Sequence, residues 1–393
     1  MRILVLTYEF PPVGGGGGRA ARDLCEKLVG RGHDVLVLTS HLEGLPKEET
    51  VQGVHIKRIS VMHREAFAAT LRDMGGYIAS GLWTGMRILP DWKPDVMQIH
   101  FAVPTGPAGW ILSRIYQVPY VLTAHLGDVP GGVPEKTGRW FRWVYPFTHP
   151  IWKGAAQVVA VSEYTRHLAL KHYPVDIQVL PNGVDIKELN PGQIKVGDPP
   201  QIVFPARFVT QKNPLQVIRV LAGLQDLPWK CVMLGDGPLR PQIEAEICEH
   251  GLDERFELAG WVAPEQVLAY YARSDILFMP SLAEGFPLTG VQALAMGLAI
   301  VASRVGGFVD MVHDDENGYL YEPYDTQGMQ SGLRNMLSNK EKLLAMRMRS
   351  RERSVQFDLD QIVDGYERIF EKVVARSNPS ASVDPQTPDQ SIN

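Results

Sequence analysis

Three things that are scarce in this chain narrow its class. Its three cysteines are far apart and show no metal-binding spacing, so we expect buried, reduced thiols in a cytoplasmic protein rather than a disulfide framework. A basic excess is also missing, and the net charge of −5 argues against nucleic acid as a partner. The chain lacks any apolar run of about 18 residues, which predicts no membrane-spanning helix. Its apolar start at residues 3–6 fits a first strand better than a signal peptide.

What the chain has in abundance is alternation of short β-rich runs with amphipathic stretches. Such an order predicts parallel sheets covered by helices on both faces, the α/β class. A length of 393 residues exceeds one ordinary core, so we expect two Rossmann-like domains. The expected strands of the first half are 3–7, 34–39, 55–59, 96–100, 120–123, 157–161 and 177–180. Those of the second half are 201–205, 230–234, 256–258, 276–279 and 299–302.

The expected domain boundary lies in a segment rich in proline and glycine. Pro181-Asn182-Gly183 is typical of a turn, and further prolines follow up to residue 200. We therefore predict domains at 1–184 and 185–357 and a last helix at 358–376. The Pro- and Ser-rich end, 377–393, is predicted to be disordered.

Five consecutive glycines, Gly14–Gly18, follow the first expected strand and open a helix. Glycines let a ligand approach the backbone, and a helix N-terminus offers free N–H groups to an anion. The loop also fits the dinucleotide site of a nicotinamide oxidoreductase, or a flexible connector. A dinucleotide site needs an acidic residue at the tip of the second strand. The chain has Leu38-Thr39-Ser40-His41 there, which counts against that alternative.

In the second half, charged and glycine-rich turns follow successive strands. Arg207 and Lys212 follow the first of them, where two cations can bind both phosphates of a nucleoside diphosphate and offset charge on a leaving group. The turn Gly235–Pro238 follows the next strand, as a ligand contact or as a tight connection. Trp261 and Val262 follow the third. There the backbone edge can hydrogen-bond a base, or the tryptophan can belong to the core.

A second polar cluster follows the next buried strand. Glu284 can accept hydrogen bonds from sugar hydroxyls. We expect the helix after it to point free N–H groups of Gly290 and Val291 toward the same crevice. Gln292 can reach a ribose, or it can form a capping box with Thr289 at the helix start. These two roles are compatible.

In the first half, His125 stands directly after the expected strand 120–123, with His100 at the end of the preceding strand. Ligands of open α/β sheets bind at the carboxyl ends of strands, so His125 can hydrogen-bond a sugar hydroxyl, although a lone histidine is often structural. Residues 139–153 mix aromatics with cations. That composition fits a membrane-surface helix or a helix that packs its aromatic face on the sheet.

The order of these pieces resembles the glycosyltransferase family 4 enzymes, the retaining glycosyltransferases of group 1, which have the GT-B fold of two facing Rossmann-like domains with an interdomain cleft. There is one departure: the second position of the family's E-x7-E pattern is Gln292 here, which keeps an acceptor oxygen but loses the charge. The resemblance extends over roughly residues 1–375. It rests on Pro11–Arg19, Thr123–Asp128, Val161–Glu163, Leu180–Asp185, the Arg207/Lys212 pair, Gly235–Pro238, and Glu284–Phe286 with Ala293.

The resemblance implies that a sugar moves from a nucleotide-diphosphate sugar to an acceptor with retention of anomeric configuration, without a metal ion or another cofactor. The last helix would cross back to the N-terminal domain. By motif position, Arg207 and Lys212 would bind the diphosphate, and Glu284 would bind the donor sugar. Gly15 and Gly16 would face the phosphates of the donor, and His125 would lie beside the reacting carbon. The backbone near Trp261 and Val262 would recognise the base.

We therefore predict a retaining glycosyltransferase whose active site lies between the two domains. UDP-sugars are the favoured donors, with GDP- and ADP-sugars as alternatives, and the acceptor is a glycan, a lipid or a small molecule. Two other functions stay open: a GT-B epimerase or hydrolase of nucleotide sugars, and a noncatalytic nucleotide-sugar binder. Peripheral contact with the inner membrane face is compatible with the aromatic stretch.

Overall fold

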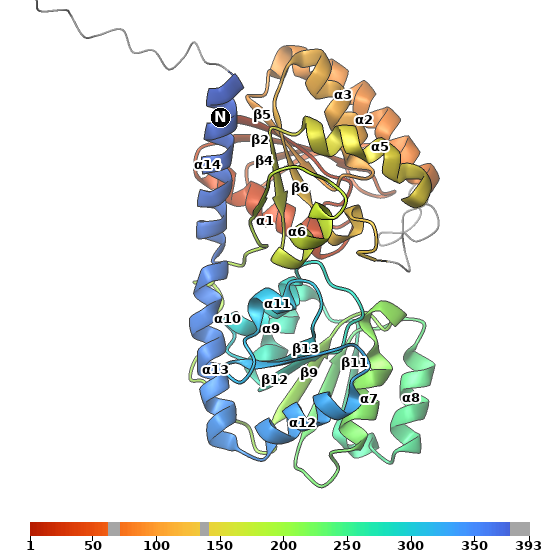
Figure 1. Cartoon of the computed structure of the whole chain (residues 1–393), viewed down its shortest axis with the longest axis vertical. Coiled ribbons are helices and arrows are strands. Elements are labelled where there is room, and N and C mark those ends of the chain that lie inside the picture. The colour runs from red at the N-terminus through yellow and green to blue at the C-terminus, as the bar shows by residue number, and fades with distance from the viewer. Residues whose placement is uncertain (62–70, 134–140, 378–393) are drawn as a thin grey trace, which may run out of the picture.

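The chain folds into two α/β lobes, each built on its own sheet (Figure 1). The computed structural model describes residues 1–61, 71–133 and 141–377. Within these residues the first sheet has eight strands in the order β3-β4-β2-β1-β5-β6-β7-β8, parallel except for the edge pair β3–β4. Its strands are β1 (Arg2–Leu6), β2 (Asp34–Ser40), β3 (Glu48–Val51), β4 (Val54–Ile59), β5 (Val96–His100), β6 (Tyr120–Ala124), β7 (Gln157–Ala160) and β8 (Ile177–Val179).

Helices cover both faces of this first sheet, because its strands send apolar side chains to each side in turn. In β1, Ile3 and Val5 pack in one hydrophobic cluster, while Leu4 and Leu6 pack in another on the opposite face. None of the described helices has the length and apolarity needed to span a bilayer. The helices of this lobe are α1 (Gly16–Gly30), α2 (Leu71–Trp92), α3 (Thr105–Tyr116), η1 (Leu126–Asp128), α5 (Phe141–Gly154) and α6 (Glu163–Leu170).

The second sheet is parallel throughout its described strands, in the order β11-β10-β9-β12-β13-β14. Its strands are β9 (Gln201–Pro205), β10 (Lys230–Leu234), β11 (Phe256–Gly260), β12 (Ile276–Met279), β13 (Ala299–Ser303) and β14 (Gly318–Tyr321). Its helices are η2 (Thr210–Lys212), α7 (Pro214–Ala222), α8 (Arg240–Glu249), η3 (Asp253–Arg255), α9 (Pro264–Ala272), α10 (Leu288–Ala295), α11 (Phe308–Met311), α12 (Thr326–Leu337) and α13 (Lys340–Ser354).

Each sheet has one point where the direction of strand addition reverses. In the first sheet this switch point lies between β1 and β5, and in the second between β9 and β12. Loops leaving the carboxyl ends of two such strands diverge, which leaves a crevice where open α/β sheets bind ligands. The segments that follow three of these strands, β1, β9 and β12, carry the predicted site residues Gly15, Gly16, Arg207, Lys212 and Glu284.

Two connecting segments cross where the lobes meet. Val184 N donates to Phe357 O at 3.1 Å, and Leu359 N donates to Val184 O at 2.9 Å. After η4 (Val355–Phe357), helix α14 (Leu359–Ser377) runs back along the first lobe (Figure 1). There the Tyr366 hydroxyl lies 3.2 Å from Thr123 Oγ1 of β6. The division at 184/185 and 357/358 falls at this crossing and stays a prediction.

All twelve expected strands are present, and β5, β9, β10 and β12 have the bounds predicted. Two strands were not predicted. β3 is an exposed edge strand of mostly polar residues, and β14 is a four-residue run that begins with glycine, so neither shows a strong alternation. Ser377, assigned to the tail, is the last residue of α14. The rest of the predicted disordered tail, 378–393, lies outside the described residues.

Candidate functional site

The carboxyl ends of the two sheets face each other, and the loops that leave them touch. Leu126, after β6, shares a hydrophobic cluster with Ala283, after β12. The amide of Glu163, after β7, donates to Asp310 Oδ2 of α11 at 3.0 Å. Because ligands bind at the carboxyl ends of parallel strands, both sheets direct a ligand to this meeting of loops.

A close ion pair joins two of the predicted site residues in the second lobe. Lys212 Nζ lies 2.6 Å from Glu284 Oε1, and the side chains are 19% and 6% exposed. Since Lys212 follows β9 and Glu284 follows β12, the pair spans the switch point of the sheet. Leu282 N donates to Gln211 O at 2.8 Å, and Gln211 Nε2 donates to Ala283 O at 2.9 Å. The two loops are thus held together at several points.

Arg207 lies at the same edge as an exposed cation. Its guanidinium makes no hydrogen bond or ion pair with any residue that the structure describes. The neighbouring turn after β10 approaches it closely: a Cβ at Gly235 would collide with Ala206 O, and one at Gly237 would lie 2.6 Å from Phe208 O. Only glycine fits at these two positions, so the backbone around Arg207 is fixed while its side chain is free to meet an anion.

A glycine pair that sequence reasoning missed supports the loop of Glu284. Gly306 has a φ of 56°, and a Cβ there would collide with Glu284 O. Gly307 N donates to Gly285 O at 2.7 Å. The turn after β13 therefore fixes the backbone of the carboxylate loop. The available signal was a Gly-Gly pair shortly after an expected strand.

In the first lobe, the His125 ring stacks on Phe101, with ring centroids 4.2 Å apart and planes at 24°. A Cβ at Gly17 would lie 3.4 Å from His125 Cε1, so the glycine loop lies against this ring. Burial lowers the pKa of His125 to about 4, which keeps the imidazole neutral at pH 7. Its Nε2 is buried and has no hydrogen-bond partner among the described residues. The ring is therefore available as a neutral hydrogen-bonding group.

His125 is held next to the carboxylate loop of the other lobe. A Cβ at Gly285 would lie 3.5 Å from Leu126 Cβ, which places the neighbours of His125 and Glu284 in contact. His125 N donates to Asp128 Oδ2 at 2.8 Å. Burial raises the pKa of Asp128 to about 7, although backbone N–H groups that donate to it act in the opposite direction. Asp128 thus positions the backbone of the histidine.

Buried polar atoms without partners gather at these carboxyl ends. Both ring nitrogens of His100 and the Oγ of Ser281 have no hydrogen-bond partner among the described residues. The His100 ring lies 5.8 Å from that of His125, centroid to centroid. Burial, and secondly His125, lower the pKa of His100 to about 3. Such atoms are uncommon in folded proteins and mark places where a ligand can supply the missing partner. In the described part of the chain, no three His, Cys, Asp or Glu side chains converge as a metal site would require.

One of the two glycine amides expected to face the donor phosphates is already hydrogen-bonded within the protein. Gly15 N donates to Glu9 Oε2 at 2.9 Å, so this amide is not free for a phosphate. Gly16 is exposed, and no atom lies within 4 Å of the place that a Cβ would take, so its phosphate contact stays a prediction. Glu9 itself was missed. It follows β1 closely, and the rule that ligands bind at carboxyl ends could have identified it.

The expected donors of α10 were wrong. The amides of Gly290 and Val291 donate to Pro287 O, at 3.0 and 3.3 Å, because the helix begins one residue earlier than predicted and uses them to close its first turn. The capping box of Thr289 with Gln292 is also absent, since Pro287 is the N-cap and no side chain caps the helix. Within the described residues, the Gln292 amide makes no hydrogen bond and so is free to reach a ligand.

Trp261 is not a core residue, since it is 70% exposed. Val262 is half-buried and packs on the core of the second lobe. Gly235 N donates to Gly260 O at 2.7 Å, which places the chain after β11 beside the glycine turn near Arg207. A contact of Trp261 and Val262 with a base stays a prediction.

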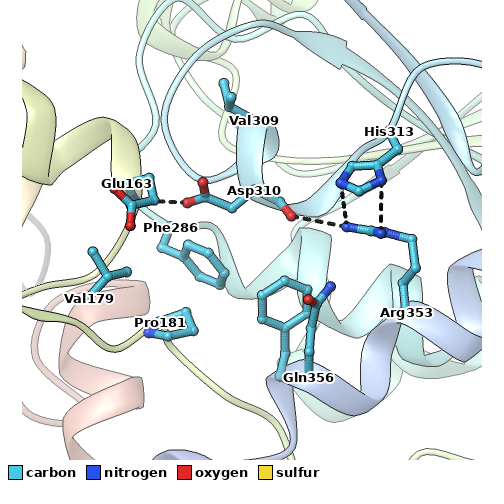
Figure 2. Close-up of a pocket in the computed structure, with 10 residues that line it drawn as sticks. Glu163, Val179, Pro181, Phe286, Val309, Asp310, His313, Arg353 and Gln356 are labelled. Atoms are coloured by element: carbon cyan, nitrogen blue, oxygen red, sulfur yellow. Dashed lines mark hydrogen bonds between the residues drawn. The ribbon is translucent and has the colours of Figure 1, made fainter.

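A cavity of about 400 Å³ lies between the lobes, beside the carboxylate loop (Figure 2). At one side of it the Arg353 guanidinium contacts the His313 ring at 3.0 Å, and Asp310 accepts a hydrogen bond from the backbone amide of Glu163. Phe286 contributes to its wall, but none of the predicted site residues does. Its lining is Glu163, Val179, Pro181, Phe286, Val309, Asp310, His313, Arg353, Gln356 and Phe357.

Known protein families match nearly the whole of this arrangement. The family described as Glycosyltransferase Family 4 matches residues 14–188, and the family described as Glycosyl transferases group 1 matches residues 185–353. The chain belongs to the group 1 glycosyltransferases. It is an enzyme of this class, as the resemblance implied.

Individual relatives and solved structures resemble this glycosyltransferase over most of its length. An uncharacterized glycosyltransferase of Methanocaldococcus jannaschii is 24% identical over 375 residues, which cover 95% of this chain and 99% of the relative. Sucrose-phosphate synthase from Thermosynechococcus elongatus superposes with a TM-score of 0.84 at 20% identity, over 95% of this chain and 99% of that one. Anabaena HepE, solved in complex with UDP-glucose, has a TM-score of 0.74 at 19% identity, over 95% and 100% of the two chains. The predicted GT-B fold is confirmed.

Proposed function

We propose that this glycosyltransferase binds a nucleotide-diphosphate sugar at the carboxyl edge of its second sheet. Arg207 and Lys212 hold the diphosphate, and Glu284 accepts hydrogen bonds from the donor sugar. The observation that carries the proposal is the Lys212–Glu284 ion pair at a switch point, with the unpaired Arg207 at the same edge. HepE, which shares the fold, was solved with UDP-glucose, and this supports a UDP-sugar as the first donor to test.

Lys212 can interact with two groups, the carboxylate of Glu284 and a phosphate of the donor. In the free protein its ammonium neutralises Glu284. Its three N–H groups can also reach a phosphate oxygen, while the guanidinium fork of Arg207 binds a phosphate through two hydrogen bonds. As the glycosidic bond breaks, negative charge grows on the leaving diphosphate. Two cations already in place stabilise that charge without having to reorganise.

The first lobe supplies the acceptor side of the reaction. His125 is neutral at pH 7 and next to the loop of Glu284, so it can hydrogen-bond a hydroxyl of the donor sugar near the reacting carbon. We propose that configuration is retained, as the resemblance implies, and that the chemistry needs no metal ion. Proton NMR of the first product gives the anomeric configuration, and inversion would contradict retention. Turnover in excess EDTA tests the metal, and loss of activity restored by a divalent cation would contradict this part.

A thermal-shift panel of UDP-, GDP- and ADP-sugars tests donor binding. A donor at about a hundred times its dissociation constant stabilises the protein by about 2.7 kcal/mol. Arg207→Ala should abolish the shift without lowering the melting temperature of the free protein. Arg273→Ala, which removes an exposed arginine between α9 and the amino end of β12, is the matched control and should keep the shift. A full shift in Arg207→Ala would remove the diphosphate assignment.

Gln292 is the observation that favours a different activity. Its uncharged amide stands where the family pattern has a carboxylate, which is compatible with an epimerase or hydrolase of nucleotide sugars, or with a noncatalytic binder. Incubation with UDP-glucose separates these functions. Release of UDP only with an acceptor supports transfer, and an acceptor-independent sugar product supports the alternatives. Binding without any product supports a binder. If the Gln292 side chain contacts the ribose, Gln292→Glu should change the reaction rate or the donor preference.

Some aromatic side chains of the stretch 139–153 are buried and others are exposed. Phe141 and Trp152 of α5 are buried, whereas Trp143 and Phe147 are 77% and 76% exposed. Residues 139 and 140 of this stretch lie outside the described residues. We propose a cytoplasmic enzyme whose exposed pair touches the inner membrane face. Trp143→Ser/Phe147→Ser should lose co-sedimentation with liposomes, and equal sedimentation of both proteins would contradict the contact.

A further inference from the structure

A second cavity, of about 630 Å³, opens at the end of the first lobe that is opposite the active site. Arg114 lies near the end of α3, before β6. Lys153 comes just before β7, and Tyr173 shortly before β8. The amino ends of neighbouring parallel strands lie at one edge of the sheet, while His125 follows the carboxyl end of β6. The cavity is therefore separate from both donor and acceptor positions. Its lining is Arg114, His149, Pro150, Trp152, Lys153, Gly154, Tyr173, Pro174 and Val175.

The rim of this cavity is positive in a chain that is negative overall. Arg114 and Lys153 are exposed, and neither side chain forms an ion pair with a described residue. His149 adds an imidazole, and none of the lining residues is acidic. Two unpaired cations around one hollow whose lining holds no acidic residue create a positive local field, which favours an anionic ligand.

Two of the lining residues are buried aromatics, and one of them carries an unsatisfied donor. Trp152 and Tyr173 stack with centroids 4.1 Å apart and planes at 4°. Trp152 is 1% exposed, and its Nε1 has no acceptor among the described residues. An indole N–H can only donate a hydrogen bond, and a buried donor without an acceptor is uncommon. This second observation also indicates a ligand that brings acceptor atoms.

We propose that this cavity binds a small phosphate-bearing molecule, with Arg114 and Lys153 on the phosphate and the Trp152–Tyr173 pair beside its organic part. Phosphate oxygens only accept hydrogen bonds, which matches a lining of donors and cations. The volume lies within the range of about 300–1,000 Å³ typical of small-molecule sites. The ligand is either a soluble phosphate ester or the headgroup of a phospholipid. The proposal does not depend on the donor site described above.

Calorimetric titration with inorganic pyrophosphate tests the site. Because pyrophosphate also suits the donor site, every protein in the series carries Arg207→Ala. Adding Arg114→Ala and Lys153→Ala should weaken the remaining binding at least tenfold. The matched control adds Lys171→Ala, an exposed cation just after α6 and outside the lining, and should bind as the parent does. Both substituted side chains are exposed, so the melting temperatures without ligand should agree. Absence of binding in the parent, or equal binding with and without Arg114 and Lys153, would overturn the proposal.

Co-sedimentation with phosphatidylglycerol vesicles separates the two sources of phosphate. If vesicle binding falls with Arg114→Ala/Lys153→Ala and survives Trp143→Ser/Phe147→Ser, the ligand is a lipid headgroup. If only pyrophosphate binding depends on Arg114 and Lys153, the ligand is a soluble phosphate ester. Independence of both measurements from these two cations would overturn the site.

Discussion

Removal of Lys212 should destabilise the free protein far more than removal of Arg207, although both substitutions should abolish donor binding. The Glu284 side chain is 6% exposed, and its ion-pair partner within the described residues is Lys212. Taking one partner from a buried pair leaves an uncompensated charge, which destabilises by about 3–5 kcal/mol. The Lys212 side chain is 19% exposed, so water screens part of this effect. We therefore expect about 2–4 kcal/mol for Lys212→Ala, and within about 0.5 kcal/mol of the parent for the exposed Arg207→Ala.

Urea denaturation of the free proteins measures this difference. At about 2–4 °C per kcal/mol for a lobe of this size, Lys212→Ala should also melt roughly 4–16 °C below the parent. The double variant Lys212→Ala/Glu284→Gln replaces the stranded carboxylate with a neutral amide, and it should recover at least half of the lost stability. None of the three variants should show a donor-induced thermal shift.

Two results would refute this reasoning. If Lys212→Ala is as stable as Arg207→Ala, the ion pair does not hold the carboxylate in solution. If Lys212→Ala keeps the donor-induced shift, the ammonium does not bind the diphosphate. A double variant less stable than Lys212→Ala would show that Glu284 needs its charge for another contact.

Three further predictions concern the surroundings of the site. Gly306→Ala should destabilise the protein by more than about 2 kcal/mol and remove the donor-induced thermal shift, because its Cβ would collide with the carbonyl of Glu284 at a positive φ. The control Gly75→Ala, which has open space around it, should have neither effect. A normal donor-induced shift in Gly306→Ala would show that Gly306 does not hold the Glu284 loop in place. His100 has its pKa lowered from 6.5 to about 3, so the unfolded chain binds a proton in that pH range that the folded chain does not, and stability falls as pH drops below 6.5. His100→Leu should therefore flatten the loss of stability between pH 6 and pH 4 by about 1.4 kcal/mol per pH unit in urea titrations, and an unchanged slope would show that the ring protonates in the folded state. Asp310→Ala removes the acceptor that links α11 to the first turn of α6, and it should lower the free energy of unfolding by about 1 kcal/mol, with Asp310→Asn losing less; equal stability of all three proteins would show that this bond does not contribute.

The sequence located the loops that carry the proposed site but not the contacts that their residues make. Arg207, Lys212, Glu284 and His125 were recognisable because each follows a β-rich run, and such positions bind ligands in open α/β sheets. The start of α10 was misplaced by one residue, and this small error decided whether the amides after it are free. Helix boundaries depend on hydrogen bonds that local composition predicts poorly.

By itself, the sequence determined the α/β class, the order of strands and helices, and the membership of the glycosyltransferase family, because these follow from local periodicity and from motifs in a fixed order. The tertiary structure alone decided that Lys212 pairs with Glu284 and that Gly306 supports the same loop. It also decided that Arg114, Lys153 and Trp152 surround one hollow. These contacts join residues on different strands, so they depend on strand order and lobe packing. Spacing along the chain carries little information about either.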